Sequence, residues 1–246
     1  MAKEVFNRHE LKFLINQQTY YDINKALKPY LTMDLHGDGN GYYTVSNIYY
    51  DTKDNLFHYE KMKGQDFRQK LRLRTYNQAD LNSDAFIEIK KKHSGLVNKR
   101  RTILPLSKAY EFIGDNVENI DTNENSTANL QILKEIKFLV DFYELEPKVV
   151  LCYDRQAFQS IEDPDLRVTF DKNLRKRTED FCLASGSYGE IYLPQDIYVL
   201  EIKVSERIPL WLAKILSEFR CSMQSFSKYS TCHNTVDTLT INRKTG

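Results

Sequence analysis

The sequence is poor in the features that mark disulfide frameworks, zinc sites and membrane spans. It has four cysteines, Cys152, Cys182, Cys221 and Cys232; none forms a C-x-x-C pair and no Cys/His cluster has zinc spacing. We therefore expect reduced thiols, as in cytosolic proteins. No apolar run approaches the ~18 residues that a membrane-spanning helix needs, and the first residues lack the apolar segment of a signal peptide. We expect a soluble, cytoplasmic protein.

An excess of charge of one sign is also lacking. The 246 residues carry 35 Lys and Arg against 34 Asp and Glu, a net charge of +1. A protein that coats nucleic acid would be basic overall, so any anion site must come from local clustering of cations. Fixed-period repeats, low-complexity stretches and Pro/Gly-rich linkers are missing as well. We predict one domain over 1–246, with the polar stretch 121–127 as a loop inside it.

Short strand patterns recur along the chain and alternate with helical patterns. Strands are predicted at about 7–15, 43–51, 66–77, 84–92, 97–104, 149–157, 165–172 and 197–204. Apolar residues at helical spacing predict helices at about 17–31, 107–114 and 129–143, a fourth from Pro209 to Phe219 and a further one at about 228–240. Ser107 would cap the second of these helices, and Pro209 would be the first residue of the fourth.

The strand from Phe67 to Thr75 shows the clearest alternation between an apolar and a charged face. Its even-numbered positions are four successive cations, Arg68, Lys70, Arg72 and Arg74. The same split recurs in four other strands. Their charged faces carry Glu10, Lys12, Glu88, Lys90, Arg167, Asp171, Glu201 and Lys203.

Two strands are less regular. In 149–157, Arg155 shares a face with apolar residues. In 97–104 the cations Lys99 and Arg101 share parity with Val97 and Ile103, so the pattern does not assign their face.

A charged strand face is ordinarily the solvated side of an antiparallel sheet. Here, however, four successive cations on one face repel one another unless an anion or facing acids compensate. Amphipathic helices are also available to cover the apolar faces. We therefore predict a β-rich α+β fold: a closed eight-stranded antiparallel β-barrel, or tunnel, with a charged lumen and with helices packed outside. Such a lumen would be wet and would accept a polyanion.

Short motifs occur in the same order as in a known family. They are Arg8–Phe13 (RHELKF), Ile48–Thr52 (IYYDT), Arg68–Tyr76 (RQKLRLRTY), Phe86–Lys90 (FIEIK), Lys99–Arg101 (KRR), Tyr153–Phe158 (YDRQAF), Leu166–Asp171 (LRVTFD), Leu200–Lys203 (LEIK) and Ser227–Tyr229 (SKY). In this ordered set the chain resembles the polyphosphate polymerase (VTC) domain, one of the triphosphate tunnel metalloenzymes. The resemblance covers nearly the whole chain, and its specificity comes from the order of the motifs.

The resemblance implies transfer of the terminal phosphoryl group of ATP to a growing polyphosphate chain, with Mn²⁺ or Mg²⁺ as cofactor. By position, Glu201 would bind the metal, with Glu10 and Glu88 as further metal candidates, because hard cations prefer carboxylate oxygens. The catalytic cations would be Arg72, Arg74, Lys90, Arg155, Arg167 and Lys228. Further phosphate-binding candidates are Lys12, Arg68, Lys70, Lys99, Arg101 and Lys203. Asp51 and Asp171 would orient cations or loops.

One departure from the superfamily bears on the reaction. Its hydrolase branch opens with E-x-E-x-K, whereas this chain has R-H-E-L-K, so that Arg8 replaces the first acid. That change favours a polymerase over triphosphatases and class IV-type adenylate cyclases. Eukaryotic polymerase subunits also carry a regulatory helical domain and membrane helices, neither of which is evident in this sequence. Coupling of synthesis to translocation would then need a separate membrane partner.

Three other functions stay open. A triphosphatase would use water as the acceptor, and sequence alone does not show whether water is excluded. A non-catalytic polyphosphate-binding module would keep the cations and tolerate loss of Glu201. A binder of single-stranded nucleic acid could use basic strands with aromatic residues. The balanced net charge and the interleaving of Glu with Lys disfavour that last function, so we expect ATP and inorganic polyphosphate, not nucleic acid, as partners.

Overall fold

The computed structural model describes residues 5–34, 37–94, 96–114 and 129–233, with the side chains of residues 5–8 outside that description. The chain forms two compact units. The first comprises Met1–Asn7, Thr44–Cys152 and Arg177–Tyr188, and the second comprises Arg8–Tyr43, Tyr153–Lys176 and Gly189–Gly246. The single domain over 1–246 stays a prediction. The predicted loop 121–127 and residues 234–240 of the last predicted helix lie outside the described residues.

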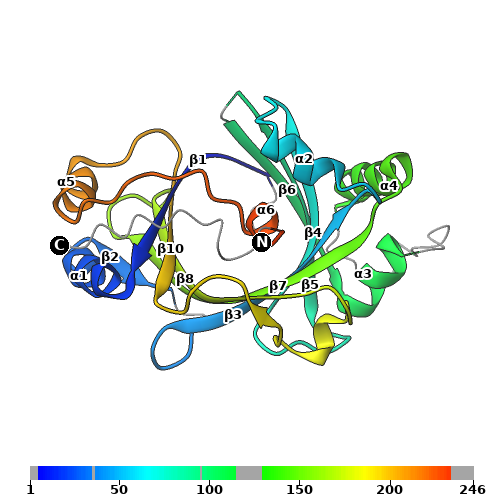
Figure 1. The fold of residues 1–246 in the computed structure, drawn as a ribbon, viewed down its shortest axis with the longest axis horizontal. Helices are drawn as coiled ribbons and strands as arrows, with labels where there is room; N and C mark the ends of the chain where they lie inside the picture. Colours follow the sequence, from blue (N-terminus) through cyan, green and yellow to red (C-terminus); the bar gives the residue numbers. More distant parts are fainter. Residues whose placement is uncertain (1–4, 35–36, 95, 115–128, 234–246) are drawn as a thin grey trace. The chain divides into compact units, whose positions relative to one another are not determined.

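The first unit is a sheet with helices packed on one face (Figure 1). Its strand order is β7 (Glu146–Ser160, up to Cys152 in this unit), β3 (Tyr42–Asp51, from Thr44), β4 (Arg68–Tyr76), β5 (Asp84–His93) and β6 (Leu96–Pro105). The pairs β3–β4, β4–β5 and β5–β6 are antiparallel. Its helices are α2 (Leu56–Met62), α3 (Leu106–Ile113), α4 (Leu130–Tyr143) and the short 3₁₀ turn η1 (Leu183–Ser185).

The core of the first unit lies between the apolar strand faces and the helices. Leu71 and Leu73 of β4 are completely buried. They pack in one cluster with residues of β5, α3 and α4, among them Ile87, Ile89, Ala109, Phe112, Ile132 and Ile136. Because side chains alternate along a strand, burial of this face turns the intervening charged residues to the other side of the sheet.

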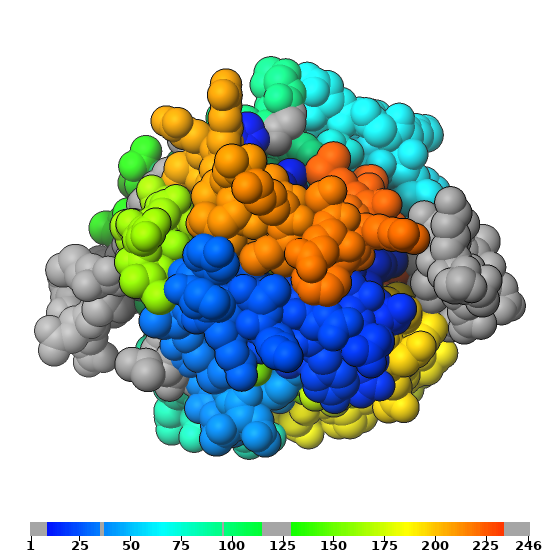
Figure 2. Space-filling model, turned by 90° about the vertical axis from the view of Figure 1, so that its left-hand side faces the viewer, coloured from blue at the N-terminus to red at the C-terminus, as the bar shows by residue number. Residues whose placement is uncertain are grey.

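The second unit repeats this design. Strands β1 (Val5–Asn16), β10 (Ile197–Val204), β8 (Arg167–Arg177) and β9 (Glu190–Ile191) follow one another as antiparallel neighbours, β2 (Leu31–Met33) pairs with the end of β7, and β7 also pairs with β8. Helices α1 (Gln17–Leu27) and α5 (Leu210–Glu218) lie side by side at the surface (Figure 2). They cover Phe13, Phe170, Leu200 and Ile202 on the apolar strand faces. The four-residue helix α6 (Lys228–Thr231) is largely buried.

All of the predicted strands are present to within a few residues, but several local predictions were wrong. The helix predicted over 17–31 ends at Leu27, because Pro29 interrupts it and Leu31 begins β2. Ser107 is not a cap: α3 starts at Leu106, and the N–H of Ser107 donates to the carbonyl of Leu81. Pro209 precedes α5 as its cap residue and is not its first helical residue.

The predicted β-rich α+β class, with antiparallel strands and helices on the apolar faces, is confirmed within each unit. Closure of eight strands into one barrel around a charged lumen is not shown by these sheets and stays a prediction. Within the described ranges, no helix has both the length and the apolar character needed to cross a membrane.

Candidate functional site

A row of lysines crosses the charged face of the first unit. Lys70 of β4 stands opposite Lys90 of β5, and Lys90 stands opposite Lys99 of β6. Residues directly opposite one another in an antiparallel pair point to the same side, and like charges in such positions destabilise a sheet. A bound polyanion would add negative charge beside this row and so reduce the repulsion. The register also assigns Lys99 and Arg101 to this charged face, because they stand opposite Lys90 and Glu88.

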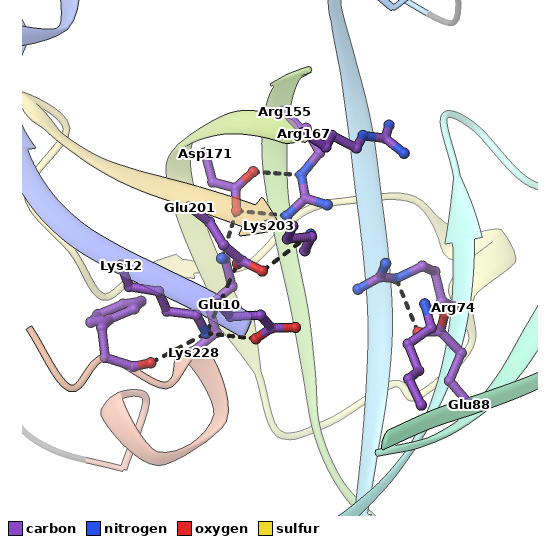
Figure 3. A network of polar contacts seen from close by, with 12 residues as sticks. Glu10, Lys12, Arg74, Glu88, Arg155, Arg167, Asp171, Glu201, Lys203 and Lys228 are labelled. Carbon is purple, nitrogen blue, oxygen red and sulfur yellow. Dashed lines mark hydrogen bonds and ion pairs between the residues drawn. The ribbon is translucent and has the colours of Figure 1, made fainter. Parts of the chain in front are cut away.

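Glu88 is the carboxylate around which the next cations gather. It is 1% exposed, and its Oε2 lies 2.5 Å from Nε of Arg72 and 3.8 Å from Nε of Arg74. Its Oε1 accepts a hydrogen bond of 2.5 Å from Nζ of Lys99. Figure 3 shows Arg74 reaching toward Glu88 across the strands. One buried carboxylate is therefore shared by three cations.

The close packing of these charges shifts the pKa values of Glu88 and Lys99. Burial alone would raise the pKa of Glu88, but Arg72, Lys99 and Arg74 hold it well below its ordinary range, so the carboxyl is ionised. Burial lowers the pKa of Lys99 to about 7, since the attraction of Glu88 is opposed by Arg72 and Arg74. A bound phosphate would therefore favour the charged form of Lys99.

Two uncharged side chains that sequence reasoning missed hold the arginines in place. The hydroxyl of Tyr49 accepts a hydrogen bond of 3.1 Å from Nη1 of Arg72, and Oδ1 of Asn47 accepts one of 2.8 Å from Nε of Arg74. Both residues come from β3, directly opposite the arginines they hold. The sequence signals were that both share the parity of Asp51 and that Tyr49 lies in the motif Ile48–Thr52. The carboxylate of Asp51 accepts the N–H groups of Phe57 and His58 and so orders the turn into α2, as predicted for Asp51.

The remaining candidates of this face lie at its two ends. Arg68 stands opposite Lys92, and its buried Nε has no hydrogen-bond partner within the described part of the chain. Arg101 places its guanidinium carbon 5.2 Å from the ring centre of Phe86. A cation in that position interacts with the ring face.

In the second unit, acidic and basic side chains alternate along β1 and β10, and each stands opposite a residue of the other charge. Glu10 stands opposite Lys203, and Lys12 stands opposite Glu201. Nζ of Lys12 lies 4.0 Å from Glu10 and 3.9 Å from Glu201, and it donates a 3.3 Å hydrogen bond to the carbonyl of Phe226 (Figure 3). Nζ of Lys203 lies 3.1 Å from the other oxygen of Glu201. Burial lowers the pKa of Lys203 to about 8, against the opposing attraction of Glu201.

Asp171 is the buried carboxylate of this second cluster. It is completely buried, and it accepts two hydrogen bonds from Arg155, of 2.6 Å from Nε and 2.8 Å from Nη2. Lys228, at the start of α6, lies 2.6 Å from the same carboxylate (Figure 3). Tyr153 underlies both cations, at 5.2 Å from the guanidinium carbon of Arg155 and 4.7 Å from Nζ of Lys228. Asp171 therefore orients cations, as its sequence position predicted.

Arg167 is held by Asp34, a residue that no sequence motif marks. Its Nη2 donates a 2.6 Å hydrogen bond to Oδ2 of Asp34 and a 3.4 Å bond to the hydroxyl of Tyr43. The side chain of Arg167 remains 39% exposed. Asp34 lies just past β2, a strand too short to be predicted, so no local pattern marked it.

Whether a residue fits a metal ion depends on the ligand atoms that it can offer. Among the described residues, no group of three His, Cys, Asp or Glu is placed to hold one. Glu10 and Glu201 nevertheless converge on a single ammonium, that of Lys12. The buried hydroxyl of Thr169, opposite Glu201, has no hydrogen-bond partner in the described ranges. Divalent cations often take one or two carboxylates and complete their shell with phosphate and water. Glu201 and Glu10 fit that role, because Lys12 lies only at 3.9 and 4.0 Å from them. Glu88 does not fit it, because Arg72 and Lys99 each hold one of its oxygens at 2.5 Å.

The buried Asp171 carboxylate predicts a loss of stability in acid. Burial would raise its pKa, but Arg155 and Lys228 lower it from 3.8 to about 2. Because the folded pKa is depressed, the unfolded state takes up the proton first. A contribution of about 2 kcal/mol, complete above about pH 4, is therefore lost as the pH falls toward 2. Urea unfolding of the protein from pH 5 to pH 2 should show this decline, and Asp171→Asn should flatten it. Asp141→Asn, in an exposed position of α4, should not. An equal decline in both variants would contradict the assignment.

Comparison with solved structures defines the fold class. The chain matches a Bacillus halodurans protein described as a candidate adenylate cyclase, with a TM-score of 0.54, 14% identity and coverage of 92% of this chain and 96% of the other. It also matches a Hippeastrum protein described as a candidate adenylyl cyclase with a dominant triphosphatase activity, with a TM-score of 0.54, 16% identity and coverage of 94% and 95%. At these identities the likeness concerns the fold alone.

The family model of the VTC domain matches residues 7–236, and the chain therefore belongs to the VTC domain family. It is similar to subunit 4 of the vacuolar transporter chaperone complex of Trypanosoma cruzi and of Trypanosoma brucei brucei, at 25% identity in each case over 272 aligned positions. These alignments cover 94% of this chain and 34% of the relatives, so the chain spans about a third of their length.

Proposed function

We propose that this chain is a metal-dependent polyphosphate polymerase, which transfers the terminal phosphoryl group of ATP to a growing polyphosphate chain. The observation that carries the proposal is the row Lys70, Lys90 and Lys99, like charges placed directly opposite one another on three neighbouring strands. Membership of the VTC domain family supports it. The eight-stranded tunnel, the cytoplasmic location and a separate membrane partner, all expected from the sequence, belong to the same proposal.

The chemistry asks the protein mainly for positioning and for charge stabilisation. An oxygen of the polyphosphate end forms a bond to the terminal phosphorus of ATP, and the bond from that phosphorus to the bridging oxygen breaks, which releases ADP. The planar guanidinium groups of Arg72, Arg74 and Arg155 can be held by protein acceptors and still donate to phosphate oxygens, and the lysines add compact charges. Glu88 and Asp171 hold these cations in place before substrate arrives.

Glu201 and Glu10 would hold Mn²⁺ or Mg²⁺, which supplies further charge for the transferring phosphoryl group when it is bound. Lys12, which lies beside both carboxylates, would then be released toward phosphate. Lys203 would stay paired with Glu201 and add to the positive charge of the site. Asp34 holds one nitrogen of the Arg167 guanidinium, and the exposed part of that group would contact substrate.

The test is incubation of the purified protein with ATP and Mn²⁺, followed by a gel that resolves polyphosphate. We expect a ladder of long chains, and we expect Glu201→Gln to reduce it by at least about tenfold, because a metal ligand is lost. Glu206→Gln changes an exposed glutamate on the same unit and is the matched control. Release of free phosphate without chains would instead favour a triphosphatase. Tight binding of polyphosphate without either product would favour a non-catalytic module.

A further inference from the structure

The charged face of the first unit changes character at one end. Beyond Arg74 on β4 comes Tyr76, and beyond Glu88 on β5 comes Phe86, both on the face that otherwise carries cations. Ile103 of β6 stands opposite Phe86. All three side chains are partly exposed, whereas the apolar residues of the opposite face are buried in the core. This end of the face is therefore apolar and accessible.

Two aromatic rings and two guanidinium groups meet there. The rings of Tyr76 and Phe86 lie edge to face, with centroids 5.4 Å apart at 80°. The guanidinium carbon of Arg74 lies 5.8 Å from the ring centre of Tyr76, and that of Arg101 lies 5.2 Å from the ring centre of Phe86. Aromatic faces and guanidinium planes are the surfaces on which nucleic acid bases stack.

We infer that Tyr76, Phe86 and Arg101 form a subsite for the base of a nucleoside triphosphate. This inference rests on the proposed function and adds to it a means of recognising the nucleoside. A polyphosphate chain has no group that could stack on an aromatic ring, so binding of phosphate alone would make no use of the ring faces of Tyr76 and Phe86. Their contribution is to nucleotide affinity, and they act next to the phosphate-binding cations.

The order of residues along the strands fits a nucleotide laid along them. Arg72, Arg74 and Tyr76 follow one another at every second position of β4. With a rise of about 3.3 Å per residue, Arg72 and Tyr76 are separated by about 13 Å. That span allows phosphates to lie on the cations while the base lies against the rings. Arg74, which reaches both Glu88 and the ring of Tyr76, stands at the junction.

The test compares two ligands that share a triphosphate and differ in the nucleoside. Binding of ATP and of inorganic tripolyphosphate is measured by calorimetry without divalent metal, so that neither is turned over. Phe86→Ala should weaken ATP binding by about tenfold, as expected for loss of one stacked base. Tripolyphosphate binding should change by less than about twofold, because no phosphate contact is removed. Phe138→Ala, at a 60% exposed position of α4 in the same unit, is the matched control and should alter neither ligand.

A second variant guards against a folding defect. Phe86→Leu keeps an apolar side chain of similar size and removes the ring, and it should show the same selective loss of ATP binding. Equal weakening of both ligands, or unchanged ATP binding in both variants, would overturn the subsite and leave the proposed function standing. Failure of the unchanged protein to bind either ligand would overturn the proposed function together with the subsite.

Discussion

Glu88→Gln is expected to lower the free energy of unfolding by about 3 to 5 kcal/mol, the range found when one partner of a buried ion pair is removed. Glu88 is 1% exposed and neutralises Arg72 and Lys99 through hydrogen bonds of 2.5 Å, with Arg74 at 3.8 Å. An amide has the same shape but no charge, so the three cations would repel one another without a compensating anion. Chemical denaturation of the variant and of the unchanged protein measures the difference.

The same variant allows phosphate binding to be measured as a rise in melting temperature. Because the three cations lose their internal anion, added tripolyphosphate should raise the melting temperature of Glu88→Gln more than that of the unchanged protein. Glu111→Gln is the control: this glutamate of α3 is 63% exposed and pairs with Lys108, so its loss should cost less than about 1 kcal/mol. Equal destabilisation by the two substitutions would show that Glu88 is not the counter-ion of the cluster.

The strand faces could be predicted from the sequence because burial of one face fixes the other. In β4, the side chains of Leu71 and Leu73 are completely buried, and the cations at alternate positions therefore lie on the opposite face. The alternation did not assign the faces of a strand in which odd and even positions both include apolar residues. In β6, only the register with β5 assigns Lys99 and Arg101 to the charged face. Register depends on pairing between strands, which no single segment encodes.

The cations of the site could be predicted, but most of the groups that hold them could not. Motif order singled out Arg74 and Arg167, while Asn47 and Asp34, which bind them, looked like ordinary polar residues. Arg167 and Asp34 are 133 residues apart in sequence. Such contacts arise from tertiary folding and leave no local periodicity. The short elements β2, β9 and α2 escaped prediction because a few residues carry too little pattern.

Both units use a buried carboxylate to hold cations that would otherwise repel one another. Glu88 does so for Arg72 and Lys99, and Asp171 does so for Arg155 and Lys228. In each case the cations keep the pKa of the carboxyl low although burial would raise it. The cations are therefore held in position by the protein itself, which would reduce the reorganisation needed in the proposed phosphoryl transfer.

Arg155→Lys is expected to slow phosphoryl transfer by about 100-fold, although it preserves the charge. Arg155 is 6% exposed and binds both oxygens of Asp171 through Nε and Nη2, which leaves Nη1 for a substrate oxygen. A lysine has one ammonium and lacks the planar fork, so it can satisfy Asp171 or the substrate but not both in this geometry. Steady-state measurement of ATP turnover, with the melting temperature recorded in parallel, separates this loss from unfolding.

Arg175→Lys provides the matched control on the same unit. Arg175 reaches Asp154 through one nitrogen at 2.8 Å, and its side chain is 21% exposed, so an ammonium can replace it with little cost. Its turnover should stay within about threefold of the unchanged protein, as expected for a partly exposed pair. If both substitutions slow the reaction alike, the fork of Arg155 is not specifically required. If only Arg155→Lys does so, positive charge alone is insufficient, and the guanidinium group of Arg155, which binds Asp171 through two nitrogens, is required.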